Sequence, residues 1–263
     1  MANSSNVLTI NNLNSPSYAT DEALNRLRVN FGFCGSDFHK VVITSSTPDE
    51  GKSYIAFNLW QKLAEAGKKV VLVDADLRKS EMRSVHQIVN EDGAYLGLAH
   101  YLAGQAFQED VVYSTNLENA YMVPIAYTVS NPAILLQNPK MEKLLNSLAE
   151  TFDYVLVDTP PLGSVSDGGL IASMCDGALL VVRSGVTPAR MVSESLKQLE
   201  RSNCQLMGTV LSRAQREYNP YYYRKSKYGY GYGYGYGYGY GNHDEEKSEK
   251  HKKIHFFSKK SDK

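Results

Sequence analysis

Cysteine is scarce in this chain, and long apolar runs are missing altogether. Three cysteines, Cys34, Cys175 and Cys204, lie far apart among 263 residues and have apolar neighbours. An odd, widely spaced set excludes a disulfide framework and a cysteine-based metal site, so we expect all three to be reduced, buried and cytosolic. No run approaches the roughly 20 apolar residues of a spanning helix, and the N-terminus has neither a basic region nor an apolar core. We therefore expect a chain that is not secreted and does not cross a membrane by itself.

Net charge is also missing, because 28 basic and 28 acidic side chains cancel. The cancellation is uneven, since residues 221–263 hold ten Lys and Arg against five Asp and Glu. The rest of the chain therefore carries a net charge of minus five. An acidic body argues against a nucleic-acid binder, although a basic terminus can still contact an acidic partner or a membrane surface.

What the chain does have is a series of short β-branched runs, most of them followed by a helical pattern. Strands are predicted at residues 40–45, 69–74, 154–158, 178–183 and 206–211, and helices at 21–33, 53–66 and 140–151. Continuous apolar strands are typical of a sheet that is buried on both faces. The predicted fold class is α/β, with a mainly parallel sheet covered by helices on both faces.

The composition changes abruptly after Pro220. Ten of the 19 tyrosines and seven of the 20 glycines lie between residues 221 and 241, mostly as Tyr-Gly repeats. Such a segment cannot build a core. We predict four regions: a flexible lead-in at 1–20, a globular domain at 21–220, a tyrosine-rich tail at 221–241 and a charged, disordered terminus at 242–263.

A phosphate-binding loop is predicted between the first of these strands and its helix. Gly51-Lys52-Ser53 ends a P-loop pattern, in which glycine permits close approach, lysine reaches the β and γ phosphates, and the serine hydroxyl binds Mg²⁺. Ser46 stands where that pattern has its first glycine. The predicted nucleotide contacts are Ser46, Thr47, Pro48, Asp49, Glu50, Gly51, Lys52, Ser53 and Tyr54.

Carboxylates follow two further strands. Asp74 ends the strand at 69–74 and is followed by Asp76 and Arg78, and Asp158 ends the strand at 154–158. Open α/β sheets bind ligands at the carboxyl ends of their strands, so these groups are expected near the loop. Asp158 has the place of a Walker B carboxylate, which binds Mg²⁺ through water. The sequence therefore predicts ATP and Mg²⁺ as cofactors.

Taken together, these motifs and the tyrosine cluster resemble the bacterial protein tyrosine kinases (BY-kinases) of capsule and exopolysaccharide synthesis, over roughly residues 20 to 241. The form resembled is the Gram-positive one, in which the P-loop kinase is a separate chain. The resemblance implies transfer of phosphate from ATP to protein tyrosine. It implies catalytic roles for Lys52, Asp74, Asp76 and Arg78, with Asp74 as proton acceptor, and metal contacts from Ser53, Asp74 and Asp158.

The same resemblance implies the acceptors and the partners. The acceptors would be the tail tyrosines of a neighbouring subunit, namely Tyr221, Tyr222, Tyr223, Tyr228, Tyr230, Tyr232, Tyr234, Tyr236, Tyr238 and Tyr240. A ring-like homo-oligomer would form through Glu22, Arg26 and Arg28, a membrane-spanning co-polymerase would activate the kinase, and a tyrosine phosphatase would reverse it. The location implied is cytoplasmic, against the inner face of the plasma membrane.

This sequence departs from the family pattern at three positions. The oligomerisation motif has Asn25 in place of its first arginine, the last strand ends in Ser212 instead of an asparagine that contacts the base, and the loop carries Asp49 where glycine is frequent.

Two other functions stay open at this point. A partitioning or cell-division ATPase of the MinD or ParA type has the same fold, but such proteins carry a signature lysine where this chain has Thr47. The second open function is that of a catalytically weak regulatory module that binds nucleotide. Arg78 also has a structural interpretation, as an ion-pair partner of Asp76 or as a helix-entry residue. A tail of this composition can simply associate with other chains.

Overall fold

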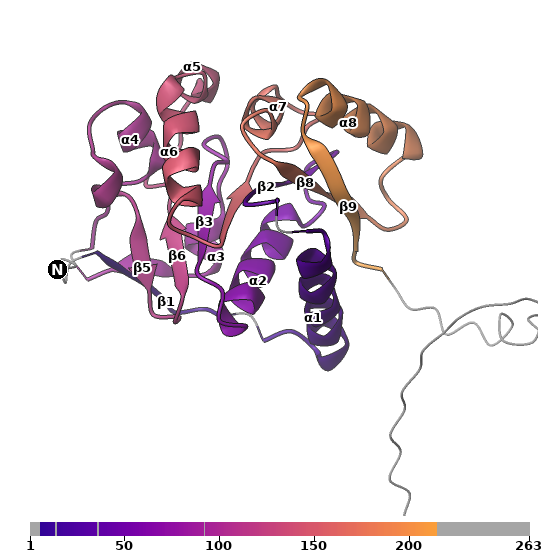
Figure 1. Cartoon of the computed structure of the whole chain (residues 1–263), viewed down its shortest axis with the longest axis horizontal. Coiled ribbons are helices and arrows are strands. Elements are labelled where there is room, and N and C mark those ends of the chain that lie inside the picture. Colours follow the sequence, from indigo (N-terminus) through magenta and orange to yellow (C-terminus); the bar gives the residue numbers. More distant parts are fainter. Residues whose placement is uncertain (1–5, 14, 36, 92, 215–263) are drawn as a thin grey trace, which may run out of the picture. The chain divides into compact units, whose positions relative to one another are not determined.

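A nine-stranded sheet organises the chain, in the order β4-β1-β5-β6-β3-β7-β2-β8-β9. The computed structural model (Figure 1) describes residues 6–13, 15–35, 37–91 and 93–214. The predicted tail and charged terminus lie outside these residues. The described residues belong to one compact unit, Met1–Arg216.

Five parallel strands form one half of this sheet. They are β3 (Val70–Asp74), β7 (Tyr154–Asp158), β2 (Lys40–Ser45), β8 (Gly177–Arg183) and β9 (Gln205–Ser212). All five strands predicted from β-branched runs are present, within one residue of the expected bounds at each end. Because they run in parallel, their carboxyl ends meet at one edge of the sheet.

Helices cover both faces (Figure 1), as the apolar strands predicted. One face carries α1 (Tyr18–Phe33), α2 (Lys52–Glu65) and α3 (Met82–Val85). The other carries α4 (Leu98–Leu102), α5 (Pro132–Leu136), α6 (Pro139–Ala149), α7 (Asp167–Ala172) and α8 (Ala189–Arg201). A single turn of 3-10 helix spans Gln108–Asp110.

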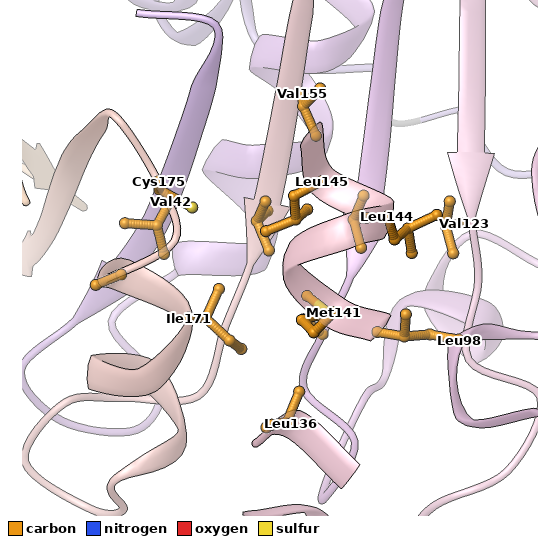
Figure 2. Packing of buried hydrophobic residues seen from close by; sticks show 14 of the residues in the cluster. Val42, Leu98, Val123, Leu136, Met141, Leu144, Leu145, Val155, Ile171 and Cys175 are labelled. Carbon is orange, nitrogen blue, oxygen red and sulfur yellow. The ribbon is translucent and has the colours of Figure 1, made fainter. Parts of the chain in front are cut away.

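Alternate residues of each central strand belong to two separate apolar clusters, one on each face of the sheet. Val42 and Val155 point to the α6 and α7 face, whereas Val41 and Leu156 point to the α1 and α2 face. Figure 2 shows how Met141, Leu144 and Leu145 of α6 pack toward this sheet. Burial on both sides stabilises the central strands, so the loops that follow them have a rigid base.

The N-terminal segment corrects a prediction. Residues 7–10 were expected to belong to a flexible lead-in, but they form strand β1 (Val7–Ile10) between β4 (Ile88–Asn90) and β5 (Tyr113–Thr115). Leu8 is 0% exposed and Ile10 2% exposed, so alternate side chains enter the core. Strand β6 (Ala120–Val123) joins this group to β3.

The three cysteines differ in how deeply they are buried. The prediction of buried, unpaired thiols is confirmed for Cys175 and Cys204, but Cys34 is half-buried at the end of α1. A helix terminus at the surface keeps Cys34 accessible although its neighbours are apolar. Among the described residues, no helix has the length and hydropathy required to span a bilayer.

Candidate active site at the carboxyl edge of the sheet

The predicted phosphate loop connects β2 to α2. Asp49 (φ 62°) and Gly51 (φ 90°) adopt left-handed backbone conformations, which glycine tolerates and most other residues avoid. Within the described part of the chain, the N–H groups of residues 49–54 donate to no protein acceptor. Together with the first turn of α2, they form a set of free donors of the kind that binds anions.

The far side of this loop is anchored to the body. Ser46 is 0% exposed, its hydroxyl lies 2.9 Å from that of Ser195 on α8, and its carbonyl accepts the Gly163 N–H at 3.1 Å. A Cβ on Gly163 would lie 2.5 Å from the same carbonyl, so this approach requires glycine. Ser46 therefore fits at the first-glycine position because it bonds to α8.

Lys52 starts α2 and points at carboxylates. Its ammonium lies 3.3 Å from Asp76 and 3.2 Å from the Ser53 hydroxyl. Burial alone lowers the pKa of Lys52, but Asp158, Asp76 and Asp74 more than offset that effect, and the pKa is raised. The lysine therefore carries its charge in the site.

Asp74 and Asp158 are partners in the register of two neighbouring strands, β3 and β7. Each is 2% exposed. Burial and the carboxylate of Asp158 raise the pKa of Asp74 to about 8, although the hydroxyl of Ser80 donates to it. Burial likewise raises the pKa of Asp158 to about 6, against the opposing effect of Lys52. Two acids that are held side by side away from water resist carrying two negative charges.

A magnesium ion fits this set of donors. The Oδ1 atom of Asp158 is buried and has no hydrogen-bond partner among the described residues. Ser53, Asp74 and Asp158 offer hydroxyl and carboxylate oxygens, which Mg²⁺ prefers. Within the described ranges, no group of three or more His, Cys, Asp or Glu residues is placed to hold a metal ion. Phosphate oxygens and water would have to complete the coordination shell, as is usual for Mg²⁺.

Arg78 pairs with a residue that the sequence did not single out. Its Nε donates to Asp167 Oδ2 at 2.6 Å and one terminal nitrogen to Oδ1 at 3.2 Å, whereas the structural interpretation had named Asp76. Asp167 starts α7 and is 1% exposed, while the Arg78 side chain is 35% exposed. The pair therefore joins the segment after β3 to the segment after β7. An Asp at a helix start was the only sequence signal for it.

The remaining predicted contacts lie on the outer side of the loop. Pro48 and Asp49 are exposed, and Tyr54 is exposed on the first turn of α2. Glu50 is the exception, because its side chain is 1% exposed and faces inward.

The predicted oligomerisation residues lie on α1, away from the loop in the sequence. Glu22 and Arg26 form an ion pair with each other at 3.2 Å on the surface of the helix. Asn25 donates to Asp21 at 3.1 Å, and Arg28 is half-buried. Contact between subunits remains a prediction for these residues, and the tail tyrosines lie outside the described part of the chain.

Known proteins are similar to this chain in sequence and in fold. The AAA domain family matches residues 41–202. Tyrosine-protein kinase CpsD of Streptococcus agalactiae is 36% identical over 202 residues, which are 77% of this chain and 87% of that protein. The kinase domain of the Escherichia coli tyrosine kinase ETK has a TM-score of 0.67 and 29% identity, covering 81% of this chain and 80% of that one.

A more distant structure shares the fold. The septum site-determining protein MinD of Pyrococcus horikoshii, solved as a complex with Mg-ADP, has a TM-score of 0.57 and 25% identity, covering 70% of this chain and 75% of that one. The predicted P-loop NTPase fold is confirmed. Since the match to CpsD extends over most of both chains, this chain belongs to the bacterial tyrosine-protein kinases.

Proposed function

We propose that this protein is an ATP-dependent tyrosine kinase that phosphorylates the tyrosine-rich tail of a neighbouring copy and thereby regulates capsule or exopolysaccharide synthesis and export. The proposal depends on one observation above all. Asp74 and Asp158 lie side by side next to Lys52, at the edge of the sheet where the phosphate loop begins. Kinship with CpsD supports tyrosine as the acceptor.

The chemistry follows from this geometry. The tyrosine oxygen bonds to the γ phosphorus of ATP, the bond from that phosphorus to the bridging oxygen breaks, and ADP leaves. Asp74 accepts the phenol proton in its ionised form, and because burial and the neighbouring carboxylate raise its pKa to about 8, it is a stronger base than an ordinary aspartate. Lys52 and the free loop N–H groups bind the phosphates. Ser53, Asp74 and Asp158 would hold Mg²⁺, which would supply charge neutralisation when bound.

The tail fits the role of substrate. Its ten tyrosines alternate largely with glycine, a composition that favours a flexible chain, and we propose that each hydroxyl can reach an active site. Each phosphate adds nearly two negative charges, so about three would reverse the charge of plus five on residues 221–263. We propose that subunits meet in a ring through Glu22, Arg26 and Arg28 of α1, and that accumulated charge loosens this ring. A membrane-spanning co-polymerase would activate the kinase at the inner face of the plasma membrane, and a tyrosine phosphatase would reset it.

The test is phosphotyrosine formation with Mg-ATP, with and without the cytoplasmic end of the membrane activator. We expect Lys52→Met and truncation after Pro220 to abolish the signal, and Lys68→Met, at an exposed position in the segment after the same helix, to keep it. Mixing a Lys52→Met chain that keeps its tail with an active chain that lacks one should label the inactive chain. Strong ATP hydrolysis without phosphotyrosine would favour a MinD-like switch and overturn the proposal.

A further inference from the structure

The inward side of the phosphate loop contains a buried acid that the reaction does not use. Glu50 precedes Gly51 and is 1% exposed. In the described residues, no lysine, arginine or histidine forms an ion pair with it. A buried charge without a counterion is unfavourable unless hydrogen-bond donors surround it, so its partners must explain its presence.

Two of those partners belong to the loop itself. Glu50 Oε2 accepts the backbone N–H of Ser46 at 2.7 Å and that of Thr47 at 2.9 Å. The side chain thus closes a small ring at the start of the loop, opposite the free N–H groups of residues 49–54. Hydrogen bonds to a charged acceptor are about twice as strong as those between neutral groups. The carboxylate therefore stabilises the conformation of the loop from within.

The third donor comes from another part of the chain. The hydroxyl of Thr187, in the segment between β8 and α8, donates to the other oxygen, Oε1. Thr187 is held in turn, because its N–H donates to the Arg183 carbonyl at 3.2 Å. The position of the Glu50 carboxylate is thus set from outside the loop.

The backbone of Glu50 makes a parallel connection. Its carbonyl accepts the Ser212 hydroxyl at 2.5 Å, and the Ser212 carbonyl accepts the Ser184 N–H at 3.0 Å. Ser212 ends β9, the strand after which the sequence runs on to the tyrosine tail. Three segments that are distant in the sequence therefore meet at Glu50: the phosphate loop, the β8–α8 segment and the end of β9.

We propose that Glu50 is a positioning residue for nucleotide binding, and that Thr187 is the partner that holds it in place. In this arrangement the loop is organised before ATP arrives, so binding does not have to order it. The inference rests on the proposed function only in requiring that the loop binds nucleotide. It adds that affinity for the phosphates depends on a contact from the β8–α8 segment.

Thr187→Val is the informative variant, since valine has the shape of threonine but cannot donate a hydrogen bond. Removing one donor from a buried carboxylate is expected to weaken binding of Mg-ADP about tenfold. Thr187→Ser, which keeps the hydroxyl, should restore affinity to within about threefold of wild type, and Glu50→Ala should weaken it at least as much as Thr187→Val.

The matched control is Thr115→Val on β5. The Thr115 hydroxyl likewise donates a hydrogen bond, in its case to the Ala120 carbonyl at 2.8 Å, but β5 lies four strands from β2 in the sheet. Affinity for a fluorescent ADP analogue with Mg²⁺, and the melting temperature without nucleotide, should be measured on the full chain. If Thr187 had only a structural role, Thr187→Val would lower the melting temperature and leave the affinity for Mg-ADP unchanged. A specific loss of affinity at an unchanged melting temperature supports positioning.

Two outcomes would overturn the inference. One is Thr187→Val binding Mg-ADP within twofold of Thr115→Val, and the other is Thr187→Ser losing as much affinity as valine. Glu50→Ala is not needed for either decision, so its misfolding would leave the test intact. A wild type that binds Mg-ADP but forms no phosphotyrosine would contradict the kinase proposal, and the affinity series would still decide the role of Glu50.

Discussion

The site holds two kinds of buried carboxylate, and the contrast between them separates anchoring from chemistry. Glu50 and Asp167 are each 1% exposed, and Asp74 and Asp158 are each 2% exposed. We call the first two the anchor carboxylates and the second two the site carboxylates. Burial is the same in both pairs, so burial by itself does not identify a functional group. The partners of each group do.

The anchor carboxylates have donors from the chain for both oxygens. Glu50 has two N–H groups and a hydroxyl, and Asp167 has two nitrogens of Arg78. The site carboxylates lie beside each other on neighbouring strands, so each faces a second acid. Asp74 also has a donor for each oxygen, the Asp76 N–H at 3.4 Å and the Ser80 hydroxyl, but one oxygen of Asp158 has no partner among the described residues. Their pKa values are raised to about 8 and about 6. The packed strands β3 and β7 hold them in this unfavourable arrangement, which a cation would relieve.

The largest expected effect comes from removing a site carboxylate. Asp74→Asn should lower the rate of tail phosphorylation by at least about 100-fold, because the proton acceptor is lost. The free energy of unfolding should stay unchanged or rise by about 1 kcal/mol, since the raised pKa of Asp74 means that the folded site disfavours the ionised acid, whereas asparagine is neutral and has the same shape. Phosphotyrosine rates and urea denaturation, both at pH 7.5, measure the two quantities.

An anchor residue would give the opposite pattern for stability. If the free energy of unfolding of Asp74→Asn is lower than that of the wild type by more than about 1 kcal/mol, the hydrogen bonds of Asp74 stabilise the fold, and Asp74 belongs with the anchor carboxylates. The contrast between the two pairs would then fail.

A smaller effect is expected from removing an anchor. Asp167→Ala should lower the free energy of unfolding by about 2 kcal/mol, because Arg78 loses a bidentate partner that is almost fully buried. The partly exposed guanidinium can turn to water, which limits the loss. Glu194→Ala is the matched control, since its pair with Arg190 has the same chemistry at 2.9 Å on an exposed surface. It should change stability by less than about 0.5 kcal/mol. Equal losses of unfolding free energy in Asp167→Ala and Glu194→Ala would show that burial of Asp167 adds nothing to the stabilisation by its ion pair.

The sequence predicted the site carboxylates but not the anchors, and the reason is physical. Asp74 and Asp158 directly follow apolar strands, so the strand pattern alone places them at the ligand-binding edge. Asp167 lies eighty-nine residues from Arg78, and no periodicity connects the two. Glu50 was predicted as a loop contact, but its inward direction depends on the left-handed turn at Asp49 and on Thr187.

The fold shows the same division. The central parallel strands were predicted within a residue, because burial on both faces demands a continuous apolar run. Strand β1 was missed, because only Leu8 and Ile10 enter the core from a segment rich in Asn and Ser. Its position depends on pairing with β4 and β5, which a local pattern does not contain. Long-range contacts therefore decide the parts that local sequence leaves open.

A buried histidine extends the contrast between buried groups, and its substitution has the smallest expected effect on stability. His86 is 3% exposed, stacks on Phe57 with ring centroids 3.4 Å apart, and has Nδ1 3.1 Å from the Asn12 carbonyl. Burial lowers the pKa of His86, and the bond to Asn12 offsets this only in part. The folded state therefore prefers the neutral ring, whereas the unfolded chain binds a proton below about pH 6.5.

Stability from His86 should accordingly be present above pH 6.5 and be lost as the pH falls toward 5, by about 1 kcal/mol. The site carboxylates titrate in the opposite sense, because a raised pKa favours the folded state as they gain protons, so the wild type must be compared with a variant. His86→Gln should have a flatter dependence of unfolding free energy on pH between 7 and 5, measured by urea denaturation. His39→Gln, at an exposed position, should keep the wild-type slope. A wild-type slope in His86→Gln would mean that the ring does not resist protonation.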